Sequence, residues 1–194
     1  MIIIGDVHGK IQEYKKIIDS TKEKTIQVGD FGFKKQHEWH LENINSDLHK
    51  INFGNHDDTT FLNSKHSLGN YSLIENEGEK IMTVRGAYSI DKIHRTEGID
   101  WWNNEELTYE QLSNICDIYH FIQPNIMITH DCPSIIRDIL FGIKDKSITS
   151  NALEIMFSMF KPKLWIFGHH HKSIEMNYKG TKFICLNELK TITI

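Results

Sequence analysis

The sequence has little cysteine, little proline and no excess of positive charge. Its three cysteines, Cys116, Cys132 and Cys185, lie far apart and form no CxxC pair, so neither a disulfide framework nor a thiolate zinc site is indicated. The formal net charge of -4 argues against the basic surface that duplex nucleic-acid binding requires. Three prolines in 194 residues leave no proline-rich linker, so we expect one domain over residues 1–194.

Long hydrophobic runs are also absent from the sequence. No run approaches the roughly 20 apolar residues of a membrane span, and the first residues lack the basic stretch and apolar core of a secretion signal. We therefore expect a cytoplasmic protein without membrane contact. The sequence does not indicate an oligomeric state. Hydrophobic residues make up 39% of the chain, which is enough for one sizeable core.

Short apolar runs alternate with helical patterns along the chain. We predict that these runs are buried strands, and they span residues 2–4, 25–28, 50–53, 81–84, 126–128 and 164–167. Apolar stripes at helical spacing begin at Ile11, Leu112 and Leu153, and Thr108 with Gln111 forms a capping box before the second stripe. This alternation predicts a layered α/β fold with helices on both faces.

The remaining segments are less regular. Residues 173–186 are typical of a β-hairpin that turns at Lys179 and Gly180, and residues 191–194 are predicted to add a final strand. The stretch 58–80 is polar and weakly periodic, and we expect a long loop with a little local structure there. The sequence therefore predicts two mixed sheets without an evident domain boundary.

Residue types that bind metals follow five of the predicted strands. These clusters are Gly5-Asp6-Val7-His8-Gly9, Gly29-Asp30, Gly54-Asn55-His56-Asp57, Thr129-His130-Asp131 and Gly168-His169-His170-His171. In open α/β sheets, ligands bind in the crevice outside the carboxyl ends of the strands. One such residue alone could be a turn or cap residue, but five clusters at separate strand ends favour one shared site.

The chemistry of these side chains indicates the kind of metal. Imidazole together with carboxylate suits manganese, iron and zinc, whereas an all-oxygen set would favour magnesium or calcium. The clusters offer more ligands than one tetrahedral ion can use, so a pair of ions roughly 3.5 to 4 Å apart is plausible. Manganese is the expected metal, and iron, zinc and nickel are the alternatives.

The motifs GDVHG, GD, GNHD, THD and GHHH, in this order along nearly the whole chain, resemble those of the calcineurin-like metallophosphoesterases. The resemblance implies an α/β fold, a four-layer α/β/β/α sandwich with two mixed sheets, and a centre of two metal ions at the strand ends. It places Asp6, His8, Asp30 and His171 around one ion, and Asp30, Asn55, His130 and His169 around the other. Asp30 would bridge the two ions.

The resemblance also implies a reaction. A water activated by both metals would attack phosphorus, and His56 would contact the phosphoester and protonate the leaving oxygen. Asp57 could fix the orientation of His56, or it could serve a structural role. The long second motif of the protein Ser/Thr phosphatases, GDxVDRG, is not present at Asp30, so a small phosphomonoester, phosphodiester or nucleotide is the expected substrate rather than a phosphoprotein.

Two alternatives to a small-molecule hydrolase remain at this point. Relatives that have lost ligands serve as non-catalytic scaffolds for protein interaction, although all seven ligand positions are filled here. The other alternative is a nuclease or RNA-end-processing phosphoesterase, which salt-dependent binding to oligonucleotides would support.

Several further residues are candidates outside the motifs. In the segment 85–107, Arg95 could clamp a phosphate because its planar guanidinium suits bidentate recognition, and His94 could assist. Trp101 and Trp102 could stack on a base, but packing is the more common role of such a pair. His170 is expected in the shell behind the ligands or in solvent. Five more histidines are interpreted as surface or helix residues: His37, His40, His49, His66 and His120.

Overall fold

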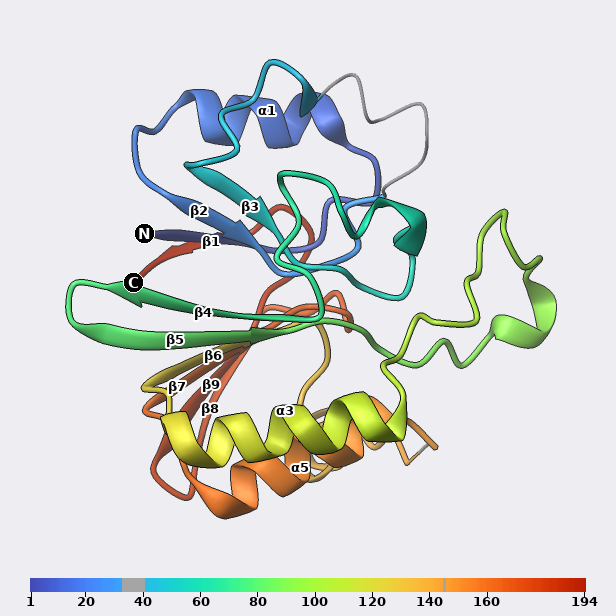
Figure 1. The fold of residues 1–194 in the computed structure, drawn as a ribbon, viewed down its shortest axis with the longest axis vertical. Helices are drawn as coiled ribbons and strands as arrows, with labels where there is room; N and C mark the ends of the chain where they lie inside the picture. The colour runs from blue at the N-terminus through green and yellow to red at the C-terminus, as the bar shows by residue number, and fades with distance from the viewer. Residues whose placement is uncertain (33–40, 145) are drawn as a thin grey trace.

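The computed structural model describes residues 1–32, 41–144 and 146–194, which are arranged in four layers (Figure 1). Helix α1 (Ile11–Asp19) covers one sheet, and three helices cover the outer face of a second sheet. The latter are α3 (Tyr109–Ile122), α4 (Ser134–Phe141) and α5 (Ile148–Met159). The predicted α/β/β/α sandwich with two mixed sheets is thus confirmed.

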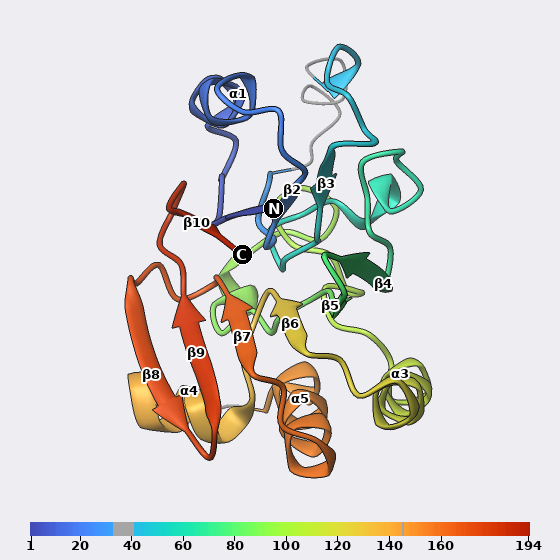
Figure 2. The same cartoon turned by 90° about the vertical axis from the view of Figure 1, so that its left-hand side faces the viewer.

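The sheet next to α1 has four strands in the order β10-β1-β2-β3. The strands are β1 (Ile2–Ile4), β2 (Thr25–Gln27), β3 (His49–Ile51) and β10 (Thr191–Thr193). Neighbours among β1, β2 and β3 run parallel, whereas β10 pairs with β1 antiparallel. The predicted final strand therefore lies beside the first strand of the chain (Figure 2).

The second sheet has six strands in the order β4-β5-β6-β7-β9-β8. The strands are β4 (Tyr71–Asn76), β5 (Glu79–Val84), β6 (Ile126–Thr129), β7 (Leu164–Phe167), β8 (Ile174–Tyr178) and β9 (Thr181–Cys185). Strands β5, β6, β7 and β9 run parallel, and β4 and β8 are antiparallel at the two edges. The predicted hairpin of β8 and β9 is confirmed.

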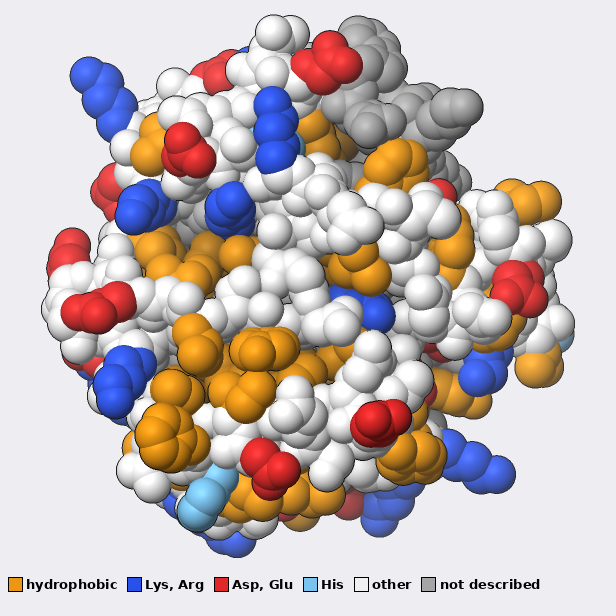
Figure 3. Space-filling model, viewed as in Figure 1, with side chains coloured by type: hydrophobic (Ala, Val, Ile, Leu, Met, Phe, Trp, Pro, Cys, Tyr) orange, Lys and Arg blue, Asp and Glu red, His pale blue; other side chains and the backbone are white. Residues whose placement is uncertain are grey.

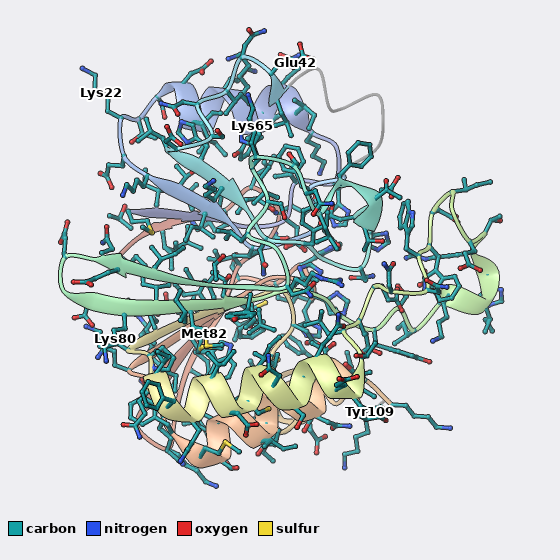
Figure 4. All side chains as sticks on the ribbon, in the orientation of Figure 1. Lys22, Glu42, Lys65, Lys80, Met82 and Tyr109 are labelled. Atoms are coloured by element: carbon teal, nitrogen blue, oxygen red, sulfur yellow. The ribbon has the colours of Figure 1, made fainter. Side chains whose placement is uncertain are left out.

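Side chains of the second sheet alternate between two cores, as the period of a strand requires. On β5, Ile81 faces the first sheet while Met82 faces the helices, and Figure 4 shows Met82 between the sheet and α3. On β7, Ile166 and Trp165 divide in the same way. A third core lies between α1 and the first sheet and includes Tyr14. The faces of both sheets are buried in these cores, so a site can form only at the ends of the strands.

The structure differs from the predicted secondary structure at two places. Residues 58–80 are more regular than a long loop with a little local structure, because Tyr71–Asn76 forms edge strand β4. Polar residues on both faces of this strand, Ser72, Glu75 and Asn76, hide its period. Helix α4, which begins after Pro133, was not predicted because its eight residues are too few to establish a periodic stripe. Short 3-10 helices also occur at Thr59–Phe61 and Lys92–His94.

The histidines outside the motifs have different environments. His49 and His66 are buried, which corrects their interpretation as surface residues: the ring nitrogens of His66 lie 3.1 Å from the carbonyl oxygens of His49 and Leu41. His120 is exposed on α3, as expected. His37 and His40 lie outside the described residues. No described helix has both the length and the apolar character to cross a membrane.

Candidate metal centre

The parallel strands of both sheets end at the same side of the molecule, where the segment 85–107 also leaves β5 (Figure 1). Four predicted ligands gather there in what we call the first ligand group: Asp6, His8, Asp30 and His171. Their ligand atoms lie within 4.8 Å of one another. The Nε2 atoms of His8 and His171 are 2.8 Å apart, and the latter is 3.3 Å from Asp6 Oδ2.

A second ligand group adjoins the first through Asp30. Its members are Asp30, His130 and His169, whose ligand atoms again lie within 4.8 Å. The Nε2 atom of His130 is 3.3 Å from Asp30 Oδ1 and 3.1 Å from Asn55 Oδ1, so the predicted Asn55 ligand reaches the same place. Asp30 Oδ2 instead lies toward His8, at 3.7 Å. The two oxygens of Asp30 therefore face different ligand groups.

The backbone at these loops adopts a conformation that few side chains accept. Four of the predicted ligands have positive φ angles: His8 (47°), Asp30 (54°), His169 (65°) and His171 (49°). Each such position costs on the order of 1 to 3 kcal/mol, and such positions cluster at functional sites. Gly54 and Gly168 allow the loops to close up, because a Cβ on Gly54 would overlap the Asp30 carboxylate and one on Gly168 would overlap Asp6.

Several buried polar atoms of the ligand groups lack a hydrogen-bond partner, and they indicate whether a metal ion fits between these residues. Among the described residues, four of these atoms are buried and have no hydrogen-bond partner: Asp6 Oδ1, Asp30 Oδ2, His130 Nδ1 and His169 Nδ1. A buried polar atom without a partner is costly, so its presence needs a reason. Cations between the carboxylates and imidazoles would satisfy the two carboxylate oxygens, and the donor set suits a divalent transition metal.

The charges of the two groups are strongly coupled. Burial by itself would raise the pKa of Asp30, but the facing rings of His130, His56 and His8 outweigh it and hold this pKa well below its usual range. Burial lowers the pKa of His169 to about 3, so its ring is neutral and can bind a metal near neutral pH. Burial also disfavours a charged His130, but the Asp30 carboxylate raises the pKa of His130 to about 9. A bound cation would take the place of that proton.

His56 lies beside the ligand groups, in contact with Arg95. The Nη1 and Nη2 atoms of Arg95 are 2.7 Å and 3.0 Å from the ring nitrogens of His56, and Nη2 donates to Asp91 over 2.8 Å. Burial and the Arg95 charge lower the pKa of His56, although Asp30 opposes them. The structure thus brings both predicted phosphate-contacting residues to the metal ligands.

Asp57 contacts the backbone of two glycine-containing loops. Its carboxylate oxygens accept hydrogen bonds from the backbone nitrogens of Gly32, at 2.7 Å, and Gly54, at 2.8 Å. Burial and the nearby Asp30 charge raise the pKa of Asp57 to about 6. These contacts join the loops after β2 and β3, and they favour the structural alternative for Asp57 over orientation of His56.

Asn55 is held by a chain of hydrogen bonds that the sequence analysis missed. Its Nδ2 donates to Ser89 Oγ over 2.9 Å, and Ser89 donates from its hydroxyl to Glu105 Oε2 over 2.5 Å and from its backbone nitrogen to Oε1 over 3.0 Å. All three residues are buried. Both partners come from the segment 85–107, in which the sequence indicates only Arg95, His94 and the tryptophans as candidates.

His170 lies behind the two ligand groups, which is one of the two places expected for it. Its ring stacks on Phe141 with centroids 4.0 Å apart, and its Nε2 is 3.1 Å from Asp131 Oδ1. Asp131 also accepts a hydrogen bond from Arg137 over 2.9 Å. Arg137 was missed because the sequence analysis did not identify helix α4. It is nevertheless almost fully buried and close to the metal ligands.

A cavity of about 260 Å³ opens onto the two ligand groups. Its lining includes Asp30, His56, Arg95 and Arg137 together with the apolar side chains of Tyr88, Ile90 and Ile143. His94 and the two tryptophans do not line it: His94 is exposed, Trp102 is buried, and Trp101 lines a separate cavity beside Arg85. These positions favour packing over base stacking for the tryptophan pair.

Several solved structures share this fold. The phosphopantetheinyl hydrolase of Mycobacterium tuberculosis aligns over 96% of this chain and 89% of its own, with 14% identity and a TM-score of 0.57. A hypothetical protein from Thermus thermophilus aligns over 96% and 74%, with 11% identity and a TM-score of 0.54. A protein named as a 5'-nucleotidase from Staphylococcus aureus aligns over 96% and 48%, with 13% identity and a TM-score of 0.52, so this chain spans about half of that protein.

The sequence itself matches a family model. The model for the calcineurin-like phosphoesterases covers residues 1–173, which include every residue of both ligand groups. No curated protein sequence matches the chain significantly. Residues 174–194 lie beyond the family match but supply β8, β9 and β10 to the two sheets.

Proposed function

The chain belongs to the calcineurin-like phosphoesterase family and is a metal-dependent phosphoester hydrolase, and from this premise we propose that it cleaves small phosphate esters at a centre of two divalent ions. The observation that carries the proposal is the division of the Asp30 carboxylate between two ligand groups. One carboxylate that faces two sets of ligands suits a pair of ions held close together.

We propose that Asp6, His8, Asp30 and His171 hold one ion, and that Asp30, Asn55, His130 and His169 hold the other. When bound, such ions lower the pKa of a water molecule and neutralise the oxygens of a phosphoryl group. The mixture of imidazole and carboxylate ligands supports manganese as the metal, with iron, zinc or nickel as alternatives.

His56 and Arg95 are proposed to act on the substrate. A phosphoryl group beside Asp30 would meet Arg95, whose guanidinium can form two parallel hydrogen bonds to phosphate oxygens. This contact would draw Arg95 away from the ring nitrogens of His56, to which it now lies within 3.0 Å. His56 would then donate its proton to the leaving oxygen as a general acid.

The cavity supports a small substrate. Its volume of about 260 Å³ is slightly below the roughly 300 to 1,000 Å³ of pockets that enclose drug-sized ligands. A phosphomonoester, a small phosphodiester or a nucleotide would fit, whereas a phosphoprotein or a duplex would have to insert an end. All three cysteines are free, which supports the proposed cytoplasmic location.

Hydrolysis of a substrate panel tests this function. The protein is treated with a chelator, reloaded with manganese and assayed with nitrophenyl phosphate, bis-nitrophenyl phosphate, cyclic nucleotides and a phosphopeptide. We expect two metal ions per chain, loss of turnover on chelation, recovery with manganese, and the slowest turnover with the phosphopeptide. Two bound ions without turnover of any ester would instead support a scaffold, and preferential cleavage of oligonucleotides would support RNA-end processing.

A further inference from the structure

The cavity at the ligand groups is lined by polar and apolar residues. The polar residues include members of the ligand groups, His56 and Arg95. The apolar residues are Tyr88 and Ile90, which follow β5, and Ile143, which follows α4. We call these three residues the apolar wall. They come from two segments far apart in the sequence that meet at the same cavity.

The exposure of the apolar wall requires an explanation. Ile90 is 68% exposed although it lines the cavity, and Tyr88 and Ile143 are partly exposed. Single exposed apolar side chains are common on protein surfaces, but here three of them border the space next to the predicted ligands. Covering them with an apolar group of a ligand would remove their surface from water, which is favourable in proportion to the area buried.

We propose that the apolar wall is a subsite for a hydrophobic group of the substrate, an alkyl chain or an aromatic ring attached to the phosphate through its ester oxygen. The inference rests on the proposed function and specifies the substrate class. A molecule whose phosphate lies at Asp30 and Arg95 has its ester group next to the wall, because all of these residues line one cavity. Esters of sugars or polyols would leave the wall uncovered or in contact with hydroxyl groups.

The charged residues of the cavity are consistent with a substrate that has one phosphate group and one hydrophobic group. Arg95 is paired with Asp91, at 2.8 Å, and Arg137 with Asp131, at 2.9 Å. The cavity therefore has cations in place for one phosphate group, and none of the described residues that line it is a lysine, although Lys92 Nζ lies 4.3 Å from the centroid of the Tyr88 ring. A hydrophobic ester group needs no further charged partner, whereas a second phosphate would.

The same segment has apolar residues away from the cavity. Ile93 is 82% exposed and Ile99 is 65% exposed, and neither lines the cavity. Figure 3 shows hydrophobic side chains on the lobe at the right, which the segment 85–107 forms. These residues provide a matched control, because a loss specific to the wall cannot come from surface hydrophobicity of the lobe in general.

Inhibition by phosphonates of increasing chain length tests the subsite without requiring their cleavage. The manganese-loaded full chain is assayed with a nitrophenyl ester in the presence of ethyl-, butyl- or hexylphosphonate, which share one charged head, and of a butylphosphonate with a terminal hydroxyl group. We expect the inhibition constant to fall by about fourfold for each methylene group that the wall covers. The terminal hydroxyl group should reverse most of the gain from the longer chain.

The variants Ile90→Ser and Ile143→Ser should flatten this dependence, so that their loss of affinity grows with chain length, whereas Ile93→Ser should keep the wild-type dependence. A wild-type protein without chain-length dependence, or an equal dependence in all three variants, would overturn the subsite while ester hydrolysis continued. Flattening in Ile93→Ser as strong as in Ile90→Ser and Ile143→Ser would also overturn it, because the effect would then not be specific to the residues that line the cavity. Absence of both inhibition and hydrolysis would contradict the proposed function itself.

Discussion

The side-chain nitrogen of Asn55 donates to the hydroxyl oxygen of Ser89 over 2.9 Å, and this bond determines which end of the amide faces the metal ligands. With the nitrogen held by Ser89, the Asn55 oxygen lies 3.1 Å from His130 Nε2. Only the oxygen of an amide can bind a metal. Ser89, itself held by Glu105, is therefore expected to position the proposed ligand Asn55 without binding a metal itself.

The variant Ser89→Ala should weaken metal binding. Without the hydroxyl group the Asn55 amide can rotate, and loss of such a supporting partner typically costs about 10- to 100-fold in metal affinity or activity. Metal titration after chelation, together with kcat/KM, measures the effect. Ser72→Ala is the control, because Ser72 lies on the edge strand β4 and its hydroxyl group donates to the Leu68 carbonyl. An unchanged metal affinity with a lowered melting temperature would make Ser89 merely structural.

The variant Asp30→Asn should lose metal and activity together. Asp30 faces both ligand groups with different oxygens, and a neutral amide offers one donor end in place of a second anionic oxygen. We expect the metal content measured by atomic spectroscopy to fall from two ions per chain to one or none, with a corresponding loss of turnover. Two retained ions and a rate near that of the wild type would show that Asp30 is not a bridge.

The variant His56→Gln should keep its metals but discriminate between leaving groups. If His56 protonates the leaving oxygen, its removal should slow esters of poor leaving groups by roughly 10²- to 10⁴-fold. A nitrophenolate leaving group needs little protonation, so the fall in rate on a nitrophenyl ester should be much smaller. Steady-state kinetics on an alkyl or nucleoside ester and on a nitrophenyl ester compare the two. Equal losses would assign His56 to phosphate binding, and lost metal would place it among the ligands.

The three consecutive histidines should respond differently to alanine. His169→Ala and His171→Ala should each reduce the metal content, because these rings belong to the two ligand groups. His170→Ala should retain the metals but lower the free energy of unfolding by about 2 to 4 kcal/mol, since it removes a buried partner of Asp131 and a ring packed on Phe141. Metal analysis and urea unfolding separate these results. Equal metal losses in all three would refute the assignment.

Buried His66 should make stability fall in mild acid. Burial lowers its pKa from 6.5, although hydrogen bonds with the His49 and Leu41 carbonyls oppose this. The unfolded chain therefore takes up the proton first as the pH drops, and the free energy of unfolding decreases below pH 6.5 by at most about 1.4 kcal/mol per pH unit for one group. Urea unfolding from about pH 7.5 to 5 should show a shallower slope in His66→Gln. His120→Gln, on the exposed face of α3, should keep the wild-type slope.

The sequence allowed the layered fold and the clusters after the strands to be predicted, because both follow from local patterns. A buried strand such as Leu164–Phe167 is a continuous apolar run, and Gly168 with His169 follows it directly. Strand β4 could not be recognised in this way, because polar residues on both of its faces obscure its period. The pairing that makes β4 a strand is with β5, and pairing depends on tertiary structure.

The residues that support the site were missed for a related reason. Ser89, Glu105 and Arg137 carry no motif, and their roles come from the partners that folding brings to them. For Asp57 the sequence leaves two roles open, orientation of His56 or a structural role, and the hydrogen bonds of its carboxylate with the backbone of Gly32 and Gly54 favour the second. Sequence adjacency says little about direction, because neighbouring side chains in a loop can point to opposite sides.

The first ligand group also has a consequence for synthesis of the chain. The His8 and His171 rings meet across 163 positions of sequence, and β1 pairs with β10 near the other end of the chain. On a ribosome that adds about 5 to 20 residues per second, Asp6 and His8 emerge several seconds before their partners exist. A nascent chain therefore lacks one histidine of each ligand group, His169 and His171, until the last part of synthesis, and we expect both groups to be complete only after the C-terminal strands have docked.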